Sequence, residues 1–587
     1  MMSEIKSKSP KDFVCIILIS VVFVIAFITF VLTPFTYDLR VLLAGSNQSN
    51  YIGKNLIYDA YKTWDLKGVF LRVSLYTLYK VSTLFTQFGT FTFERTVNIV
   101  YAVFVVFISS ISAFLTSKEG AIQKSVLKSM LLACAFFMSD AVSHIQAEMT
   151  CVLILIFGFS LYINAQQTRK HESLKLLLAG CCIGSIFFLK SAFLVLSVAF
   201  VAAAYLWDEN NEQRPNVKKL FLLVIGSVAV LLVGTLSILA IAPREFQNIL
   251  DASVYQSTLL SGGHFSLGTL KTFLVNYFYA TMRFPVLAIG TVVTIFNATE
   301  CFKRKARLSF FMHFVLYFMP AFFVILSNKF FPYHYFVFVF SAVTEILLYY
   351  QTSIVVNLPF ATNPKHAFCI SIAFVLSVVL SLFGIIFETE SPLIYILVVF
   401  VLYLLAVFFA IFSFDKAYKV KPVLLTASFM FSIFIYAMFI SVFSKNYKAY
   451  ISLTKKAYDA NQKFSKIDFD HPVLFLDDGT GAYVTGAPSY LKYYYPLPVQ
   501  RISENSQHSD LASRVEALRQ IDDYTGEYIC VYESWIFMFA NNQSIKDKIT
   551  NEYEKTDEII RYGILHNLFL HDTEKEFIKL SFYTRKQ

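Results

Sequence analysis

The sequence predicts a polytopic α-helical membrane protein with a small α/β domain at its C-terminal end. Three observations lead to this fold class. Hydrophobic residues make up 56% of the 587 residues and charged residues only 15%, which is more apolar surface than a soluble chain of this size can bury. The apolar residues fall into runs of about 20, the length that crosses a bilayer core. After residue 444 the composition becomes polar, with short strand-like and helical segments.

The apolar runs predict about thirteen transmembrane helices when the chain is read in windows of about 20 residues. They lie near residues 12–33, 96–116, 126–143, 147–165, 174–190, 191–207, 219–242, 272–297, 309–327, 333–351, 367–387, 392–413 and 422–443. The first run is longer than a signal-peptide core and has no clear cleavage site, so we expect it to remain as a membrane span.

Residues 68–88 are apolar in part, but Arg72 and Lys80 interrupt them, and we expect this segment to lie in the membrane interface. With it left out of the count, Lys and Arg collect in the loops on the N-terminal side, whereas the opposite loops SDAVSHIQAE and FETESP contain neither. The positive-inside rule then predicts a cytoplasmic N-terminus, and we expect the protein in the plasma or inner membrane. The net charge of +10 reflects these loops, and no basic stripe indicates nucleic-acid binding.

The predicted domain organisation has two parts. Residues 1–444 form the transmembrane module, which includes a first external loop at 34–95, and residues 445–587 form an extracytoplasmic α/β domain. In the second part, VLFLDDGTGAYVTG and EYICVYES predict two strands, and SDLASRVEALRQI between them predicts a helix, a pattern typical of a partly parallel sheet. We interpret Asp477 as a loop cap, and the glycines that follow it as turn and close-packing residues.

Ionisable residues at the external ends of the predicted helices are the first candidates for function. Asp38 follows the first span directly. Asp140, His144 and Glu148 are spaced i, i+4 and i+8, so they share one face if this tip is helical. Lys190 lies in the apolar stretch FFLKSAFLVL. An ionisable group beside a membrane span indicates a functional site, although a residue near a helix end also reaches the headgroups by snorkelling.

Two further external segments combine cations with aromatic rings. Together they contribute Arg244, Tyr255, His264, Arg283, Tyr333 and His334. Arg and Lys bind phosphate through charge-assisted hydrogen bonds, and rings suit a sugar or a lipid. For His334, an aromatic-belt position is the alternative. The cysteines show no metal-ligand spacing and we assign no metal-binding residues, although isolated acids are compatible with a divalent metal as well as with a catalytic base.

The cytoplasmic loops are short and contain no nucleotide-binding fingerprint, so we expect any chemistry on the external side. There the layout resembles the GT-C superfamily of membrane glycosyltransferases, which use polyprenyl-phosphate-linked sugars. The resemblance rests on TYDLR after the first span, the acidic tip SDAVSHIQAE and the lysine of FFLKS. The chain departs from the commonest family pattern, because Leu39 follows Asp38 where a second acid is usual. It also has TWDLKG in place of an oligosaccharyltransferase WWDYG motif.

The resemblance implies an inverting transfer to a glycan, lipid or protein acceptor. Asp38, or else Glu148, would be the catalytic base. The residues implied at the donor phosphate are Lys190, Arg244, Arg283 and His334, and those near the sugar or acceptor are Asp140, His144, Tyr255, His264 and Tyr333. Two other classes stay open. A transporter of lipid-linked glycans explains the spans, although no repeated halves are visible, and a non-catalytic envelope assembly protein explains the C-terminal domain.

Overall fold

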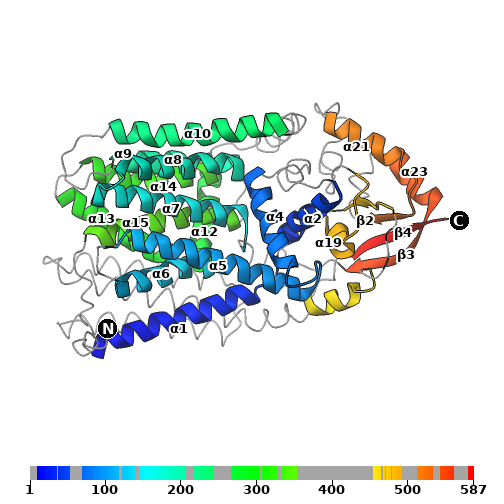
Figure 1. Cartoon of the computed structure of the whole chain (residues 1–587), viewed down its shortest axis with the longest axis horizontal. Helices are drawn as coiled ribbons and strands as arrows, with labels where there is room; N and C mark the ends of the chain where they lie inside the picture. Colours follow the sequence, from blue (N-terminus) through cyan, green and yellow to red (C-terminus); the bar gives the residue numbers. More distant parts are fainter. Residues whose placement is uncertain are drawn as a thin grey trace.

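The structure is a computed structural model. It describes residues 10–35, 37–52, 69–117, 122–138, 144–206, 217–241, 266–303, 307–327, 332–352, 454–464, 467, 469, 471–477, 479–491, 512–532, 543–560 and 579–586. Figure 1 shows a bundle of long helices that contains the N-terminus, and a smaller part with a sheet near the C-terminus. Helices α2 (Tyr37–Ile52) and α4 (Val69–Thr83) lie between the two.

The bundle confirms the prediction of a helical membrane-type fold. Its helices are α1 (Pro10–Leu32), α5 (Phe91–Leu115), α6 (Ile122–Phe137), α7 (Ala147–Thr168), α8 (Glu172–Leu189), α9 (Leu194–Leu206), α10 (Val217–Ile241), α12 (Leu267–Arg283), α13 (Pro285–Lys303), α14 (Arg307–Ser327) and α15 (Val337–Thr352). Within the described ranges, five helices are long and apolar enough to cross a membrane, namely α5, α7, α8, α10 and α14. The spans predicted near 367–387, 392–413 and 422–443 lie outside those ranges, so the count of about thirteen stays a prediction.

Helix α7 is the central helix of the bundle. Neighbouring helices bury 83% of its apolar window, compared with 22% for α10 at the periphery. A helix that is apolar on all sides and surrounded by other helices is expected at such a position. The first turn of α7 is therefore surrounded by the ends of neighbouring helices, and Glu148 in that turn is buried away from the outer surface of the bundle.

Helices α8 and α10 approach closely through glycines. A Cβ atom on Gly180 would lie 2.3 Å from the Leu223 carbonyl oxygen, and one on Gly226 would lie 2.2 Å from the Leu177 carbonyl oxygen. Small residues allow this backbone approach, which is a common way to pack helices in a membrane. The contact joins the peripheral α10 to the helix that ends at Lys190.

The prediction of one continuous helix near 272–297 is wrong, because the segment forms two helices. Helix α12 ends at Arg283 and α13 begins at Pro285, with Phe284 between them at φ −126° and ψ 82°. Proline has no N–H to donate, and it pushes the preceding residue out of the helical region. Pro285 therefore starts a new helix instead of continuing the old one.

The segment expected in the interface does form a short helix. Helix α4 has 15 residues, about 22 Å at 1.5 Å per residue, too short for a bilayer core of about 30 Å. Its Lys80 ammonium lies over the Tyr76 ring, 5.2 Å from the centroid. These features agree with the prediction that this helix does not span the membrane.

The C-terminal part contains a four-stranded sheet in the order β1-β2-β4-β3. The strands are β1 (Leu474–Leu476), β2 (Tyr528–Val531), β3 (Tyr553–Ile560) and β4 (Lys579–Arg585), and its helices include α19 (Thr480–Thr485), α21 (Ala512–Asp522) and α23 (Gln543–Glu552). Strands β1 and β2 are parallel, as predicted, whereas β4 runs antiparallel to both β2 and β3. The predicted helix between the first two strands is α21. Strands β3 and β4 were not predicted, because their alternation of apolar and polar residues is weak.

The turn after β1 has the predicted loop cap. The buried Asp477 carboxylate accepts hydrogen bonds from Gly479 N at 2.6 Å and Gly481 N at 2.8 Å. Gly479 has φ +86°, and a Cβ atom on Gly481 would lie 2.3 Å from Asp477 Oδ2. The interpretation of these glycines as turn and close-packing residues is therefore confirmed.

Candidate active site at one end of the helical bundle

Glu148 and Lys190 form an ion pair, through Glu148 Oε1 and Lys190 Nζ, at the ends of two neighbouring helices. Glu148 lies in the first turn of α7, and Lys190 caps the C-terminal end of α8 with an extended backbone. Each charge has the sign that its helix end stabilises, because a helix dipole is positive at the N-terminus and negative at the C-terminus. These two residues, 42 positions apart in the chain, therefore meet at the neighbouring ends of α7 and α8.

Aromatic rings connect this pair to His334. The Lys190 ammonium lies 5.1 Å from the centroid of Phe193, in the 3-10 turn η3 (Ser191–Phe193). Phe193 packs on Phe323 at 5.4 Å between ring centroids, and Phe323 packs edge-on against His334 at 6.1 Å. His334 is buried in the turn η4 (Pro332–Phe336) that precedes α15. The structure thus brings Lys190 and His334 to the same end of the bundle.

His144 lies in a turn before α7 and not on a helix shared with Glu148, because Ile145 has a left-handed backbone with φ +51°. The expected common face at i, i+4 is therefore wrong for these two residues. His144 Nε2 lies 2.7 Å from Asn98 Oδ1, which can only accept, so Nε2 carries the proton. Burial, and then the nearby Arg95 cation, lowers the pKa of His144 to about 3. The ring is neutral near pH 7.

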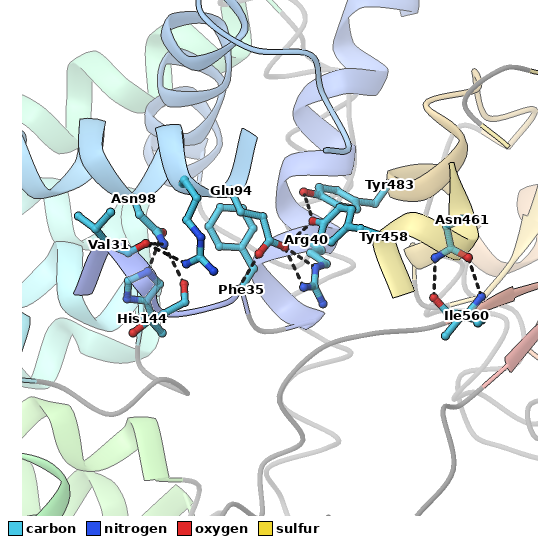
Figure 2. A network of polar contacts seen from close by, with 12 residues as sticks. Val31, Phe35, Arg40, Glu94, Asn98, His144, Tyr458, Asn461, Tyr483 and Ile560 are labelled. Atoms are coloured by element: carbon cyan, nitrogen blue, oxygen red, sulfur yellow. Dashed lines mark hydrogen bonds and ion pairs between the residues drawn. The ribbon is translucent and has the colours of Figure 1, made fainter. Parts of the chain in front are cut away.

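Asn98 and Arg95 hold the end of α1. The Asn98 side-chain amide donates to the Val31 carbonyl at 2.9 Å and to the Thr33 carbonyl at 2.8 Å. Arg95 also donates to the Val31 carbonyl, at 2.9 Å. These are carbonyls of the last turn of α1 and of its exit, which lack partners inside the helix. The network in Figure 2 continues from His144 through Asn98 to this chain segment.

Asp38 is the second residue of α2, so the structure places its backbone but does not describe its side chain. The buried Glu94 of α5 holds the chain on both sides of it. Glu94 Oε2 accepts from Phe35 N at 3.4 Å, and Glu94 Oε1 accepts from Arg40 Nε at 2.9 Å. The turn that carries Asp38 is thus anchored to the first turn of α5 (Figure 2).

The C-terminal part also contributes to this network. The Tyr458 hydroxyl donates to Glu94 Oε1 at 2.5 Å and lies 3.1 Å from the Tyr483 hydroxyl. Sequence reasoning missed Glu94, Tyr458 and Tyr483, and noted Arg40 only as a neighbour of Asp38. A signal was present at Glu94, since it is the acid in the first turn of an apolar helix whose N-cap is Thr90.

A second contact joins α2 to the C-terminal part. Gln48 Nε2 donates to the Ala487 carbonyl at 2.7 Å, and Gln48 Oε1 accepts from Ser489 N at 2.7 Å. Asn47 Nδ2 donates to the Gly486 carbonyl at 3.2 Å, while the Tyr79 hydroxyl donates to Asn47 Oδ1 at 2.8 Å. Both side chains act as substitutes for backbone groups, so α2 is bound tightly to the residues that follow α19.

A separate polar cluster lies inside the bundle. Glu345 of α15 accepts from His313 Nδ1 of α14 at 2.7 Å and from Asn297 Nδ2 of α13 at 2.8 Å. His313 Nε2 lies 3.6 Å from Cys301 Sγ. Neither the acid nor the histidine was singled out from the sequence. The cluster ties three helices together by hydrogen bonds, as buried polar groups in membrane bundles commonly do.

The remaining predicted site residues divide into two groups. Asp140, Arg244, Tyr255 and His264 lie outside the described residues. The backbone of Arg283 ends α12 and that of Tyr333 lies in η4, but their side chains are not described. Over the part of the chain that the structure covers, no three His, Cys, Asp or Glu side chains gather in a group that fits a metal ion.

No protein-family model matches the chain, and no curated protein matches it by sequence. Solved structures of an oligosaccharyltransferase from Archaeoglobus fulgidus are similar to it. The apo form has a TM-score of 0.44 at 11% identity, covering 89% of this chain and 71% of that one. AglB with an inhibitory peptide and a dolichol-phosphate has a TM-score of 0.37 at 10% identity, covering 91% and 73%. These scores are too low to define a shared fold, so the function proposed next rests on the residues of this chain.

Proposed function

We propose that the chain is an integral-membrane glycosyltransferase of the GT-C type, which moves a sugar from a polyprenyl-phosphate-linked donor to an acceptor. The observation that carries this proposal is the partly exposed Lys190 at the end of an apolar bundle, between the Phe193 ring and the buried Glu148. A lipid-borne phosphate fits such a place, because its chain stays in apolar surroundings while a cation binds its head.

Asp38 is the proposed base, because Glu148 is already the ion-pair partner of Lys190; Glu148 is the second candidate. The base accepts the proton of the acceptor hydroxyl, whose oxygen attacks the anomeric carbon. The bond from that carbon to the phosphate oxygen breaks through an oxocarbenium-like transition state, and the configuration inverts, as in inverting glycosidases.

The other predicted residues take supporting roles in this proposal. Lys190 binds the departing phosphate, together with His334, Arg244 and Arg283. The sugar and the acceptor contact Asp140, Tyr255, His264 and Tyr333. His144 was predicted with them, but because it is hydrogen-bonded to Asn98 inside the bundle end, it supports the site indirectly instead of contacting the ligands.

We propose the membrane orientation from the same arrangement. The ends of α7 and α8 that carry Glu148 and Lys190 face α2, α4 and the sheet (Figure 1). An odd number of spans, about thirteen, with a cytoplasmic N-terminus puts this end outside the cytoplasm. Residues 445–587 then form an extracytoplasmic domain beside the site.

The test is a transfer assay on the purified protein in nanodiscs, with a panel of polyprenyl-phosphate-linked sugars and release of polyprenyl phosphate as the readout. The acceptor panel contains glycans, lipids and peptides; peptides are included because a matched Archaeoglobus structure is described as tethered to an acceptor peptide with an NVT sequon. Parallel reactions contain Mg²⁺, Mn²⁺ or a chelator, since another of the similar Archaeoglobus structures is a complex with Zn and sulfate.

Asp38→Asn is expected to abolish release while the protein stays folded. Glu172→Gln is the matched control, because Glu172 lies at the opposite end of α8 from Lys190. A fully active Asp38→Asn enzyme contradicts the assignment of the base. The same protein in sealed proteoliposomes tests the alternative: movement of the intact lipid-linked sugar across the bilayer, without release of polyprenyl phosphate, favours the transporter.

A further inference from the structure

Cys301, His313 and Glu345 form a chain of contacts between α13, α14 and α15 that the proposed sugar transfer does not use. His313 Nε2 lies 3.6 Å from Cys301 Sγ, and His313 Nδ1 lies 2.7 Å from Glu345 Oε1. The second Glu345 oxygen accepts from Asn297 Nδ2 at 2.8 Å. A nucleophile, a base within hydrogen-bond reach and a third group that orients the base are the signature of an activated nucleophile.

Glu345 sets the orientation of the imidazole ring. Because a carboxylate only accepts hydrogen bonds, His313 Nδ1 carries a proton, and Nε2 is the nitrogen that faces the thiol. The His313 and Glu345 side chains are 4% and 0% exposed, so solvent does not compete for their contact. When Nε2 takes the proton of the thiol, the carboxylate stabilises the imidazolium that forms. The three side chains are therefore arranged to let the sulfur attack an electrophile.

The sulfur end of this chain of contacts is the accessible end. Cys301 is half-buried, in contrast to the histidine and the acid, and it lies two residues before the end of α13 at Lys303. The next residue, Phe302, is 72% exposed and packs on Phe310 of α14 at 6.0 Å between ring centroids. The thiol thus lies beside an apolar outer surface near a helix end, which is a position where a cysteine can carry a lipid chain that extends into the bilayer.

The position also separates this thiol from the candidate active site. Helix α14 runs from Arg307, close to the end of α13, to Ser327, and the turn with His334 follows it. Cys301 therefore lies at the end of the bundle opposite to His334 and Lys190. In the proposed orientation this opposite end faces the cytoplasm, where acyl-coenzyme A is available.

We propose that Cys301 is an S-acylation site, activated by His313, that takes its acyl group from a long-chain acyl thioester such as acyl-coenzyme A. Cys301 Sγ attacks the carbonyl carbon of the thioester, and the proton of the thiol passes to His313 Nε2. The bond from that carbon to the sulfur of coenzyme A breaks, and the leaving thiolate takes the proton from Nε2. One thioester replaces another, so the exchange needs no oxidant, reductant or further co-reactant.

The experiment incubates the full-length protein in nanodiscs with palmitoyl-coenzyme A and measures the acylation rate of each cysteine by peptide mass spectrometry. The wild type is expected to carry a hydroxylamine-sensitive acyl group on Cys301. His313→Asn should lower the rate at this cysteine about tenfold, because the base is lost. An unchanged rate in His313→Asn overturns the inference, and so does a wild type that stays unmodified at Cys301.

A relocated thiol is the matched control. The double variant Cys301→Ala/Phe302→Cys moves the thiol by one residue at the same depth of α13, to a more exposed position, and leaves the buried histidine and acid untouched. It should react about tenfold more slowly than the wild type, because the new thiol has no base beside it. An equal or faster rate overturns the inference, because exposure near a helix end is then sufficient.

The same background separates loss of the base from a disturbance of the bundle. His313→Asn added to Cys301→Ala/Phe302→Cys should leave the rate of the relocated thiol unchanged. An equal loss in both backgrounds overturns the inference. Cys301→Ser should release polyprenyl phosphate in the transfer assay like the wild type, so failure of acylation and failure of the proposed function are measured separately.

Discussion

Two buried ion pairs lie at the same end of the bundle, and only one of them is open to solvent. In the Arg40–Glu94 pair the side chains are 1% and 0% exposed, and Tyr458 and the Phe35 N–H also donate to the same carboxylate. In the Glu148–Lys190 pair, the lysine remains 20% exposed. The first pair is sealed, whereas the second has an open face.

The difference separates a structural tie from a candidate binding site. Glu94 joins α5, the turn that carries Asp38, and Tyr458 of the C-terminal part, so it holds together segments that are far apart in the chain. Glu148 joins two helix ends that are already neighbours. We therefore expect the loss of Glu94 to unfold the protein more readily than the loss of Glu148.

The largest expected effect is that of Glu94→Gln. This change removes the Glu94 charge from the buried Arg40 cation, and the loss of one partner of a buried pair costs about 3–5 kcal/mol. Thermal unfolding in detergent measures it. The double variant Arg40→Met/Glu94→Leu removes both charges and should recover much of the stability. A Glu94→Gln protein as stable as the wild type would show that the sealed pair is not a structural tie.

Low pH should destabilise this end of the bundle through His144, a buried histidine that belongs to neither ion pair. Its folded pKa, about 3, is lower than the unfolded value of 6.5, so the unfolded chain binds the proton first. Stability from this residue is complete above pH 6.5 and falls as the pH drops towards 3, by about 1.4 kcal/mol per unit at the steepest. Unfolding curves between pH 7 and 5 measure this slope, and His144→Gln should remove it. His171→Gln, at an exposed position, should leave the slope unchanged.

Glu148→Gln should destabilise the protein by about 1–2 kcal/mol, less than Glu94→Gln. The glutamine still accepts from Lys190, and the lysine keeps solvent and the carbonyl end of α8. The same unfolding assay compares the two variants directly. A loss for Glu148→Gln equal to that for Glu94→Gln would remove the distinction between the open and the sealed pair.

The smallest expected effect is that of Tyr458→Phe, which removes the hydroxyl that contacts Glu94 Oε1 and the Tyr483 hydroxyl and keeps the ring. We expect a loss of about 1 kcal/mol, the order of the net value of a hydrogen bond. Tyr205→Phe is the matched control, since Tyr205 lies on the outer face of α9 and is 38% exposed. Identical unfolding of the two variants would mean that the C-terminal part does not stabilise this network.

Much of the helical architecture was predictable, because a span needs about 20 apolar residues and that signal is local. The same holds for the break at Lys190, where a cation interrupts an apolar stretch, and for the glycine turn after Asp477. The break at Pro285 was missed although its cause is also local, because the apolar run continues across it.

The candidate site was only partly predictable. Glu148 and Lys190 were each conspicuous as charges beside apolar helices, but their pairing depends on how α7 packs against α8. Glu94 was assigned to the end of the first external loop, just before a predicted span, and its partner Tyr458 is 364 residues away in the chain. A pattern of residue types contains no information about such a distant partner.

Local sequence was enough to predict which segments are helical and apolar, where a polar loop follows the first helix, and that a small sheet follows the bundle. These properties depend on the hydrophobicity and backbone preferences of neighbouring residues. The packing of the folded chain sets which charges meet, which of the two pairs stays open to solvent, and whether the C-terminal part contacts the turn that carries Asp38. Those outcomes depend on packing between segments far apart in the chain, because burial and partner choice are set by the assembled neighbours of a side chain.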